Sequence, residues 1–213
     1  SGKTTTLYSI LNSLASDERK IITVEDPVEY QFEGITQIPV KTSESGDDGT
    51  FADKLRAILR LDPDIVMVCE IRDNDTAKTA LQASLTGHLV LATFHASSAS
   101  AALTRLSDVI GQNPLFVSAI RLVMAQRLIR QLDDTTKQAY DPTPAEPQII
   151  QNVIATLPAK VERPNLQGLK LYKPGASAEN PYAFKGQIAI REQFVMTGEI
   201  RKLLEVHDHV LSA

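Results

Sequence analysis

The chain has 213 residues, of which 43% are hydrophobic and 23% charged, a composition typical of one α/β domain with room for an appendage. Acidic and basic residues are nearly balanced, 26 against 22, and no basic block suggests direct binding of nucleic acid. No apolar run approaches the roughly 18 to 20 residues that span a bilayer, and the start lacks a signal-peptide pattern. The single cysteine, Cys69, cannot form an intramolecular disulfide.

The first residues, SGKTTTLY, match the second half of the phosphate-binding motif G-x-x-x-x-G-K-[ST] at the start of a helix. Lys3 would reach the β- and γ-phosphates, Thr4 would place its hydroxyl on Mg²⁺, and backbone amides of Ser1, Gly2 and Thr5 would surround phosphate oxygens. The alternative is an unstructured terminal tail. Because the first half of the motif is absent, we expect residues 1–213 alone to bind nucleotide weakly or not at all.

Buried strands alternate with amphipathic helices up to residue 132. The predicted strands are 21–24, 35–40, 65–69 and 88–94, and the predicted helices are 51–61, 75–85, 97–110 and 114–132. Pro39 restricts its strand to a sheet edge, and Thr50 with Asp53 forms a capping box at the start of its helix. Residues 43–49 are expected to be an exposed loop. This alternation predicts a mostly parallel sheet with helices on both faces.

The segment LDPDIVMVCEIRD, residues 61–73, contains five consecutive apolar residues followed abruptly by Glu70. Such a run indicates a strand buried on both faces. Open α/β sheets bind ligands just outside the carboxyl ends of their strands, where Glu70 would face Mg²⁺ and an attacking water. The alternative is that Glu70 turns to solvent and pairs with Arg72.

Beyond residue 132 the sequence becomes irregular. Seven of the eleven prolines fall between Asp133 and Pro181, a pattern that indicates a domain boundary and a looser structure. We predict a short helix at 149–157, a strand at 186–194 and a small helix at 199–206. The chain is therefore divided into a core, 1–132, and a small irregular C-terminal appendage, 133–213.

Four segments now stand in one order: SGKTTTLY, TVEDPVEY, LRLDPDIVMVCEIRD and TGHLVLATFH. Together they resemble the secretion ATPases that drive type II secretion and type IV pili. The resemblance runs from Ser1 to about Leu132 and weakens afterwards, although FKGQIAIREQF and EIRKLL resemble the closing segment of that family. It implies a RecA-like P-loop ATPase core that uses ATP and Mg²⁺. It also implies a cytoplasmic homo-hexamer, peripheral to the inner membrane, with an inner-membrane platform protein as its partner.

The resemblance also implies roles for single residues. SGKT matches the Walker A end and Glu70 the Walker B glutamate, so that Thr4 and Glu70 would hold Mg²⁺. EDPVE matches the family's Asp box, in which Glu29 would polarise the attacking water. TGH and FH match the His box, which would place His88 and His95 near the γ-phosphate. The alternatives are structural: Glu29 as a cap, and the histidines as hydrogen-bond partners, as at the carboxyl end of a helix.

The sequence also departs from the family pattern. No cysteine follows residues 127–132, where many relatives carry a four-cysteine zinc site, so we predict no structural zinc. Gln187 follows Gly186 where many relatives have arginine. Our leading hypothesis is Mg²⁺-dependent ATP hydrolysis by a ring-forming secretion or pilus motor. The alternatives are a RecA-like nucleic-acid motor, which the balanced charge and 5% aromatic content argue against, and a binding module without catalysis.

Overall fold

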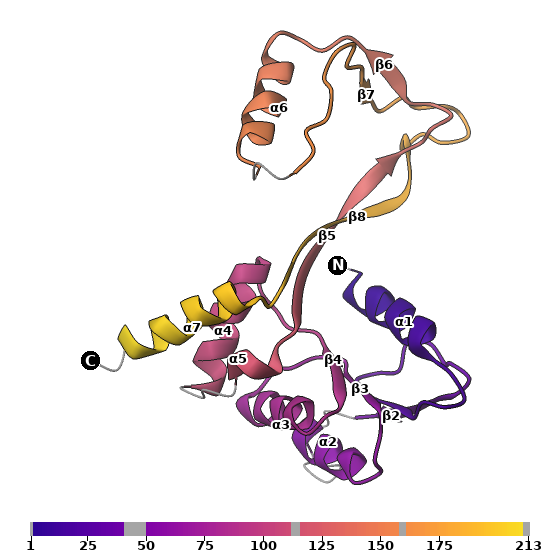
Figure 1. Ribbon diagram of the computed structural model, residues 1–213. Helices are drawn as coiled ribbons and strands as arrows, with labels where there is room; N and C mark the ends of the chain where they lie inside the picture. The colour runs from indigo at the N-terminus through magenta and orange to yellow at the C-terminus, as the bar shows by residue number, and fades with distance from the viewer. Residues whose placement is uncertain (1, 41–49, 112–115, 158–160, 211–213) are drawn as a thin grey trace. The chain divides into compact units, whose positions relative to one another are not determined.

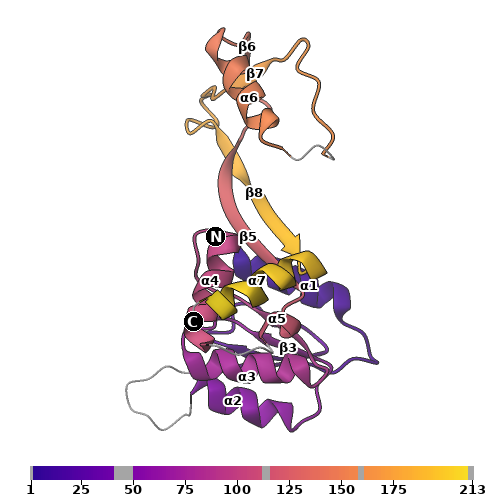
Figure 2. The same cartoon turned by 60° about the vertical axis from the view of Figure 1, so that its left-hand side comes forward.

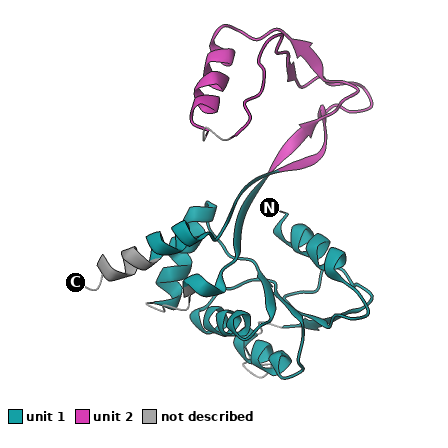
Figure 3. Ribbon diagram, viewed as in Figure 1, with its two compact units in different colours: residues 1–127, 190–213 teal, residues 128–189 magenta. Residues whose placement is uncertain are grey.

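The computed structural model describes residues 2–40, 50–111, 116–157 and 161–210, and the structural statements below refer to these ranges. The chain divides into two compact units, residues 1–127 with 190–213 and residues 128–189 (Figure 3). These bounds differ from the predicted division at residue 132, because the end of the chain packs with the first unit. No helix in the described ranges combines the length and apolarity needed to cross a membrane.

The first unit is built on a four-stranded sheet in the order β2-β1-β3-β4, in which every neighbouring pair is parallel (Figure 1). Its strands are β1 Ile21–Glu25, β2 Ile35–Pro39, β3 Ile65–Val68 and β4 Leu89–Ala92. Ile21 lies opposite both Ile35 and Ile65, and Ile65 lies opposite Leu89. The strands therefore run side by side and end at one common edge. The predicted parallel α/β sheet is confirmed, with Pro39 on an outer strand.

Helices cover both faces of the sheet because the side chains of β1 and β3 are buried on both sides. On one face, α1 (Lys3–Leu14) packs Tyr8 and Leu11 against Ile21, Ile65 and Met67. On the other, α2 (Phe51–Leu59) packs against the alternate residues of the same strands, which are Ile22, Val24, Val66 and Val68. The predicted capping box of Thr50 and Asp53 begins α2.

A third apolar cluster joins the remaining helices of the first unit, which are α3 Asn74–Leu85, α4 Ala99–Ile110, α5 Phe116–Ala119 and α7 Gly198–Val210. It contains Ala77 of α3, Leu103 of α4 and Val117 of α5, together with Met196, which precedes α7. Ile200 on α7 packs against the same cluster. These contacts place the last helix of the chain beside α4 and α5 (Figure 2).

The predicted helix 114–132 is wrong. Only the short α5 is helical, and Leu122–Leu132 forms strand β5, which pairs with β8 (Phe184–Val195) in a two-stranded sheet that we call the ribbon. The sequence LVMAQRLIRQL contains good helix formers, so the helical pattern was plausible locally. Pairing with a strand more than fifty residues later overrides that local preference. Residues 112–115 lie outside the described ranges, as does the loop predicted at 43–49.

The second unit contains α6 (Ala145–Ala155) and an antiparallel pair formed by β6 (Gln138–Tyr140) and β7 (Leu171–Lys173). Polar contacts at Asp133 join its two ends. The Asp133 carboxylate accepts hydrogen bonds from Thr135 and from the side-chain amide of Asn180, at 2.7 and 2.8 Å. These bonds lower the pKa of Asp133 to about 2, so the carboxylate that ties residues 133–137 to Asn180 stays ionised.

Candidate active site at the carboxyl edge of the sheet

The carboxyl edge of the sheet gathers polar residues that are far apart in the sequence. Strand β1 ends with Glu25, β3 is followed by Cys69 and Glu70, and His95 lies three residues beyond β4. The parallel register brings these strand ends together. In open α/β sheets this edge is where ligands bind.

Glu70 stands at the centre of this edge. One of its oxygens accepts a hydrogen bond from Nε of Arg72 at 2.5 Å, and the other contacts Nε2 of His95. Arg72 also reaches the carboxylate of Asp26, with 3.5 Å between Nη1 and Oδ2. The Glu70 side chain is only 13% exposed, so it pairs with Arg72 without turning to solvent. Asp26, Glu70, Arg72 and His95 thus form one connected charged group.

The charge state of Glu70 is set by opposing effects. Burial acts to raise the pKa of Glu70, but the hydrogen bond and positive charge of Arg72, with smaller contributions from His95 and Lys3, together lower it. Glu70 is therefore a carboxylate at neutral pH, and each of its two oxygens has a partner. Lys3, at the start of α1, is thus one of the positive charges that act on Glu70.

Helix α1 begins without a side-chain cap. Its N-cap residue, Gly2, adopts the left-handed conformation with φ of 74° and makes no side-chain capping bond. The first backbone N–H groups of an uncapped helix are unpaired donors at the positive end of the helix dipole, which suits a phosphate group. Lys3, Thr4 and Thr5 occupy the first turn. Ser1 lies outside the described ranges.

Glu25 has a structural role that the sequence did not reveal. Its side chain is 1% exposed and accepts hydrogen bonds from Tyr8 of α1, from Thr23 at 2.5 Å and from Gln37 at 3.0 Å. Three donors satisfy a carboxylate that would otherwise be costly to bury. The contact with Tyr8 ties α1 to β1 and so fixes this helix against the sheet.

Raising the pH should release this tie. Burial, and then the hydrogen bond to Glu25, raise the pKa of Tyr8 to about 12 from its ordinary value of 10.0. Because the folded state holds the proton more tightly, the stabilisation is complete below pH 10 and is lost as the pH rises towards 12. We expect the free energy of unfolding to fall by about 2 to 3 kcal/mol more in the wild type than in Tyr8→Phe over this interval.

Urea titrations on both forms at several pH values between those limits measure this difference. Other groups titrate in the same range, but they do so in both forms, so that the Tyr8 contribution is isolated by subtraction. A difference between the two forms that stays constant with pH would contradict the assignment.

Glu29 is exposed, on the loop that follows β1. Its backbone amide donates to the hydroxyl of Tyr8 at 3.3 Å. No hydrogen bond or ion pair holds its carboxylate within the part of the chain that the structure describes. The structure therefore does not bring Glu29 into contact with Glu70, and it leaves the Glu29 carboxylate exposed.

His88 does not lie with the other predicted site residues. It precedes β4, at the amino edge of the sheet, whereas Glu70 and His95 lie at the carboxyl edge. Its Nδ1 lies 3.0 Å from the carbonyl oxygen of Ala83 and 3.2 Å from the hydroxyl of Thr86, at the end of α3. These contacts match the structural alternative for this histidine, a hydrogen-bond partner at the carboxyl end of a helix, and the structure does not bring His88 together with Glu70 and His95.

From the sequence, Arg72 is a possible partner of Glu70, and Asp64 and Asp73 are other carboxylates nearby in the chain. The structure gives both aspartates other roles, since Asp73 caps α3 through Thr76 and Asp64 accepts from the backbone of Lys20. No sequence pattern could have paired Arg72 with Asp26, because the contact depends on two strands ending side by side. Among the described residues, no group of three or more His, Cys, Asp or Glu side chains could hold a metal ion by itself.

A parallel α/β sheet with an uncapped helix start, a strand-end carboxylate and a histidine at one edge has the architecture of a P-loop ATPase core. The family model for type II/IV secretion system proteins matches residues 1–212. The chain therefore belongs to the type II/IV secretion system protein family.

Three curated relatives show the same relationship. The chain is 44% identical to type II secretion system protein E of Xanthomonas campestris pv. campestris over 208 residues, which is 95% of the chain and 34% of that protein. It is 44% identical to putative type II secretion system protein E of Escherichia coli K12, over 99% of the chain and 40% of that protein. It is 41% identical to the type IV pilus assembly ATPase PilB of Thermus thermophilus, over 94% of the chain and 21% of that protein. The chain thus spans well under half of each relative.

Solved structures share the fold. The pilus retraction motor PilT with bound ADP aligns with a TM-score of 0.63 and 26% identity, covering 100% of the chain and 50% of that structure. The ATPase DotB of Legionella pneumophila aligns with a TM-score of 0.60 and 24% identity, covering 96% of the chain and 45% of that structure. These alignments confirm the predicted RecA-like fold.

Proposed function

We propose that the protein containing this chain hydrolyses ATP with Mg²⁺ and uses the energy to drive type II secretion or the assembly or retraction of a type IV pilus. The observation that carries this proposal is the position of Glu70, ionised and held by Arg72 and His95 at the carboxyl edge of the sheet. The uncapped start of α1 provides donors for phosphate groups near the same carboxylate. The relatives named for secretion and pilus assembly support this choice of process.

Each residue then has a role in phosphoryl transfer to water. The amides of Ser1, Gly2 and Thr5 hold phosphate oxygens, and Lys3 neutralises their charge. Thr4 and Glu70 are the residues that would hold Mg²⁺, Thr4 by its hydroxyl. When bound, that ion stabilises negative charge on the phosphate oxygens.

Glu29 acts on the attacking water, and His95 acts on the transferred phosphoryl group. Glu29 has an accessible carboxylate that can accept a proton from the attacking water. His95 is held beside Glu70 by its contact with that carboxylate, where its imidazole N–H groups can stabilise the negative charge that develops on the transferred group. His88 is omitted, since its ring lies at the opposite edge.

The same proposal extends to the oligomer that the protein forms, its location and its partner. We infer a homo-hexameric ring that acts in the cytoplasm, peripheral to the inner membrane, on an inner-membrane platform protein. The large exposed side chains of Leu122, Ile190 and Val195 in the first unit are consistent with contacts between subunits.

Removing the positive charge of Lys3 should lower the affinity for ATP. In the intact protein, we expect Lys3→Ala to weaken ATP binding at least about tenfold, because one charge-assisted contact to the phosphates is lost. Isothermal titration with ATP and Mg²⁺ measures the change.

Lys78→Ala is the matched control, since Lys78 is an exposed lysine of α3 without a hydrogen bond or ion pair to any residue that the structure describes. It should bind ATP as the wild type does. Equal affinity in the Lys3 and Lys78 variants would contradict the placement of phosphates at α1.

A further inference from the structure

His95 lies on the loop between β4 and α4, and this loop has no helix or strand of its own to hold it in place. The loop runs from Thr93 to Ser98 without helix or strand, and the His95 side chain is 69% exposed. Burial therefore does not fix the ring. Its position beside Glu70 depends on anchors to the loop backbone.

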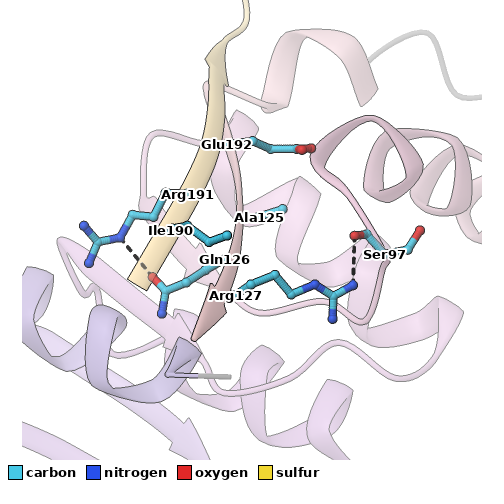
Figure 4. A pocket seen from close by; sticks show the side chains of 7 residues that line it. All are labelled: Ser97, Ala125, Gln126, Arg127, Ile190, Arg191 and Glu192. Carbon is cyan, nitrogen blue, oxygen red and sulfur yellow. Dashed lines mark hydrogen bonds between the residues drawn. The ribbon is translucent and has the colours of Figure 1, made fainter. Parts of the chain in front are cut away.

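Two of these anchors come from the ribbon. Nη2 of Arg127 on β5 donates to the carbonyl oxygen of Ser97 at 3.1 Å, and the carboxylate of Glu192 on β8 accepts from the amide of Ala99. Figure 4 shows Arg127 and Glu192 both directed toward this loop. A third anchor comes from α4 itself, where Arg105 donates to the carbonyl oxygen of His95 at 2.8 Å.

The opposite face of the ribbon contacts α1. Because side chains alternate along a strand, Gln126 and Arg191 point away from Arg127 and Glu192. The side-chain oxygen of Gln126 accepts from the hydroxyl of Thr6 at 3.0 Å. It also accepts from Nε of Arg191 at 3.0 Å (Figure 4). Thr6 lies one turn into α1, directly after the residues proposed to hold phosphate.

We propose that the ribbon positions both halves of the active site: Arg127 and Glu192 hold the loop of His95, and Gln126, steadied by Arg191, holds the phosphate-binding end of α1. These are positioning residues, which act through the groups that touch the substrate. The proposal rests on the proposed ATPase function and adds a role for four residues outside its motifs. All of the contacts lie within the first unit, residues 1–127 and 190–213.

The test is a double-mutant cycle on ATP hydrolysis by the intact protein. Arg127→Ala should lower kcat on the order of tenfold and leave KM for ATP nearly unchanged, because the His95 ring loses its alignment. On a His95→Ala background, the same substitution should have no further effect. Arg127→Lys, which keeps a donor for the Ser97 carbonyl, should restore most of the rate.

The contacts between the ribbon and α1 predict a different effect on the kinetics of ATP hydrolysis. Gln126→Leu should raise KM for ATP, whereas Gln126→Glu should restore it, since a carboxylate still accepts from Thr6 and Arg191. Thr6→Val should add nothing to Gln126→Leu. Arg121→Ala is the matched control, because Arg121 is exposed on the same part of the chain and its side chain pairs with no described residue.

The outcomes separate this proposal from the proposed function. If the wild type hydrolyses ATP but the Arg127 and His95 effects multiply, the ribbon does not act through His95 and the inference is overturned. Loss of kcat in Arg121→Ala equal to that in Arg127→Ala would overturn it too. An intact wild-type protein without Mg²⁺-dependent hydrolysis would overturn the function as well.

Discussion

Replacing Glu70 with glutamine in the intact protein should lower the turnover of ATP at least about 100-fold, while ATP binding stays within about threefold of the wild type. Glutamine keeps the size of the side chain but removes the negative charge, so the contacts of Glu70 with Arg72 and His95 lose their ionic partner. In the proposed binding mode, α1 and Lys3 hold the nucleotide, and the substitution changes neither of them. The measurement is steady-state phosphate release beside a binding titration.

Glu18→Gln serves as the matched control for this prediction. Glu18 is exposed in the turn before β1, and no described residue pairs with its carboxylate. Its removal should leave both turnover and binding unchanged. Turnover at the wild-type rate in Glu70→Gln would refute the central role of this carboxylate.

Leu11→Ala should destabilise the chain by about 2 to 5 kcal/mol. Leu11 is fully buried, and it packs with Tyr8 against Ile21 and Met67 where α1 meets the sheet. Truncating Leu11 leaves a cavity that the surrounding strands cannot close, because β1 and β3 are each hydrogen-bonded to a neighbouring strand on both sides and cannot move inward. Chemical denaturation followed by circular dichroism measures the loss.

Asn12→Ala, at the neighbouring exposed position of the same helix, should change stability by less than about 0.5 kcal/mol. Equal losses in the Leu11 and Asn12 variants would show that α1 is not packed on the sheet as described. A large loss in Leu11→Ala alone would support α1 as the fixed platform for Lys3 and Thr4.

Local sequence signals predicted the parts of the fold that local interactions determine. The capping box of Thr50 and Asp53 involves residues three apart, and it is present at the start of α2. The apolar runs of β1 and β3 are buried on both faces, as their composition indicated. Glu70 was found because a charge ends such a run.

Interactions between distant segments explain what the sequence did not predict. Strand β5 was predicted as a helix because its partner, β8, comes more than fifty residues later. The same long separation hid the contacts of Arg127, Gln126 and Glu192 with the site. Glu25 looked equivalent to its neighbours in EDPVE, and only the packing of Tyr8 over β1 shows that it is structural.

His88 illustrates how a motif can combine two positions that the fold separates. TGH and FH flank the same strand, so His88 and His95 lie at opposite ends of β4. A strand advances about 3.3 Å per residue, so the four residues of β4 alone separate its two ends by about 10 Å. Of these two histidines, His95 is the one that contacts Glu70, whereas His88 contacts the end of α3.

The rate of ATP hydrolysis by the intact protein, measured as Mg²⁺ is removed by a chelator and then restored, tests the central claim most directly. A strand-end carboxylate beside an uncapped helix start predicts hydrolysis that disappears without Mg²⁺ and returns with it, in the wild type but not in Glu70→Gln. Hydrolysis that is absent in the wild type, or that proceeds equally without Mg²⁺, would contradict the claim.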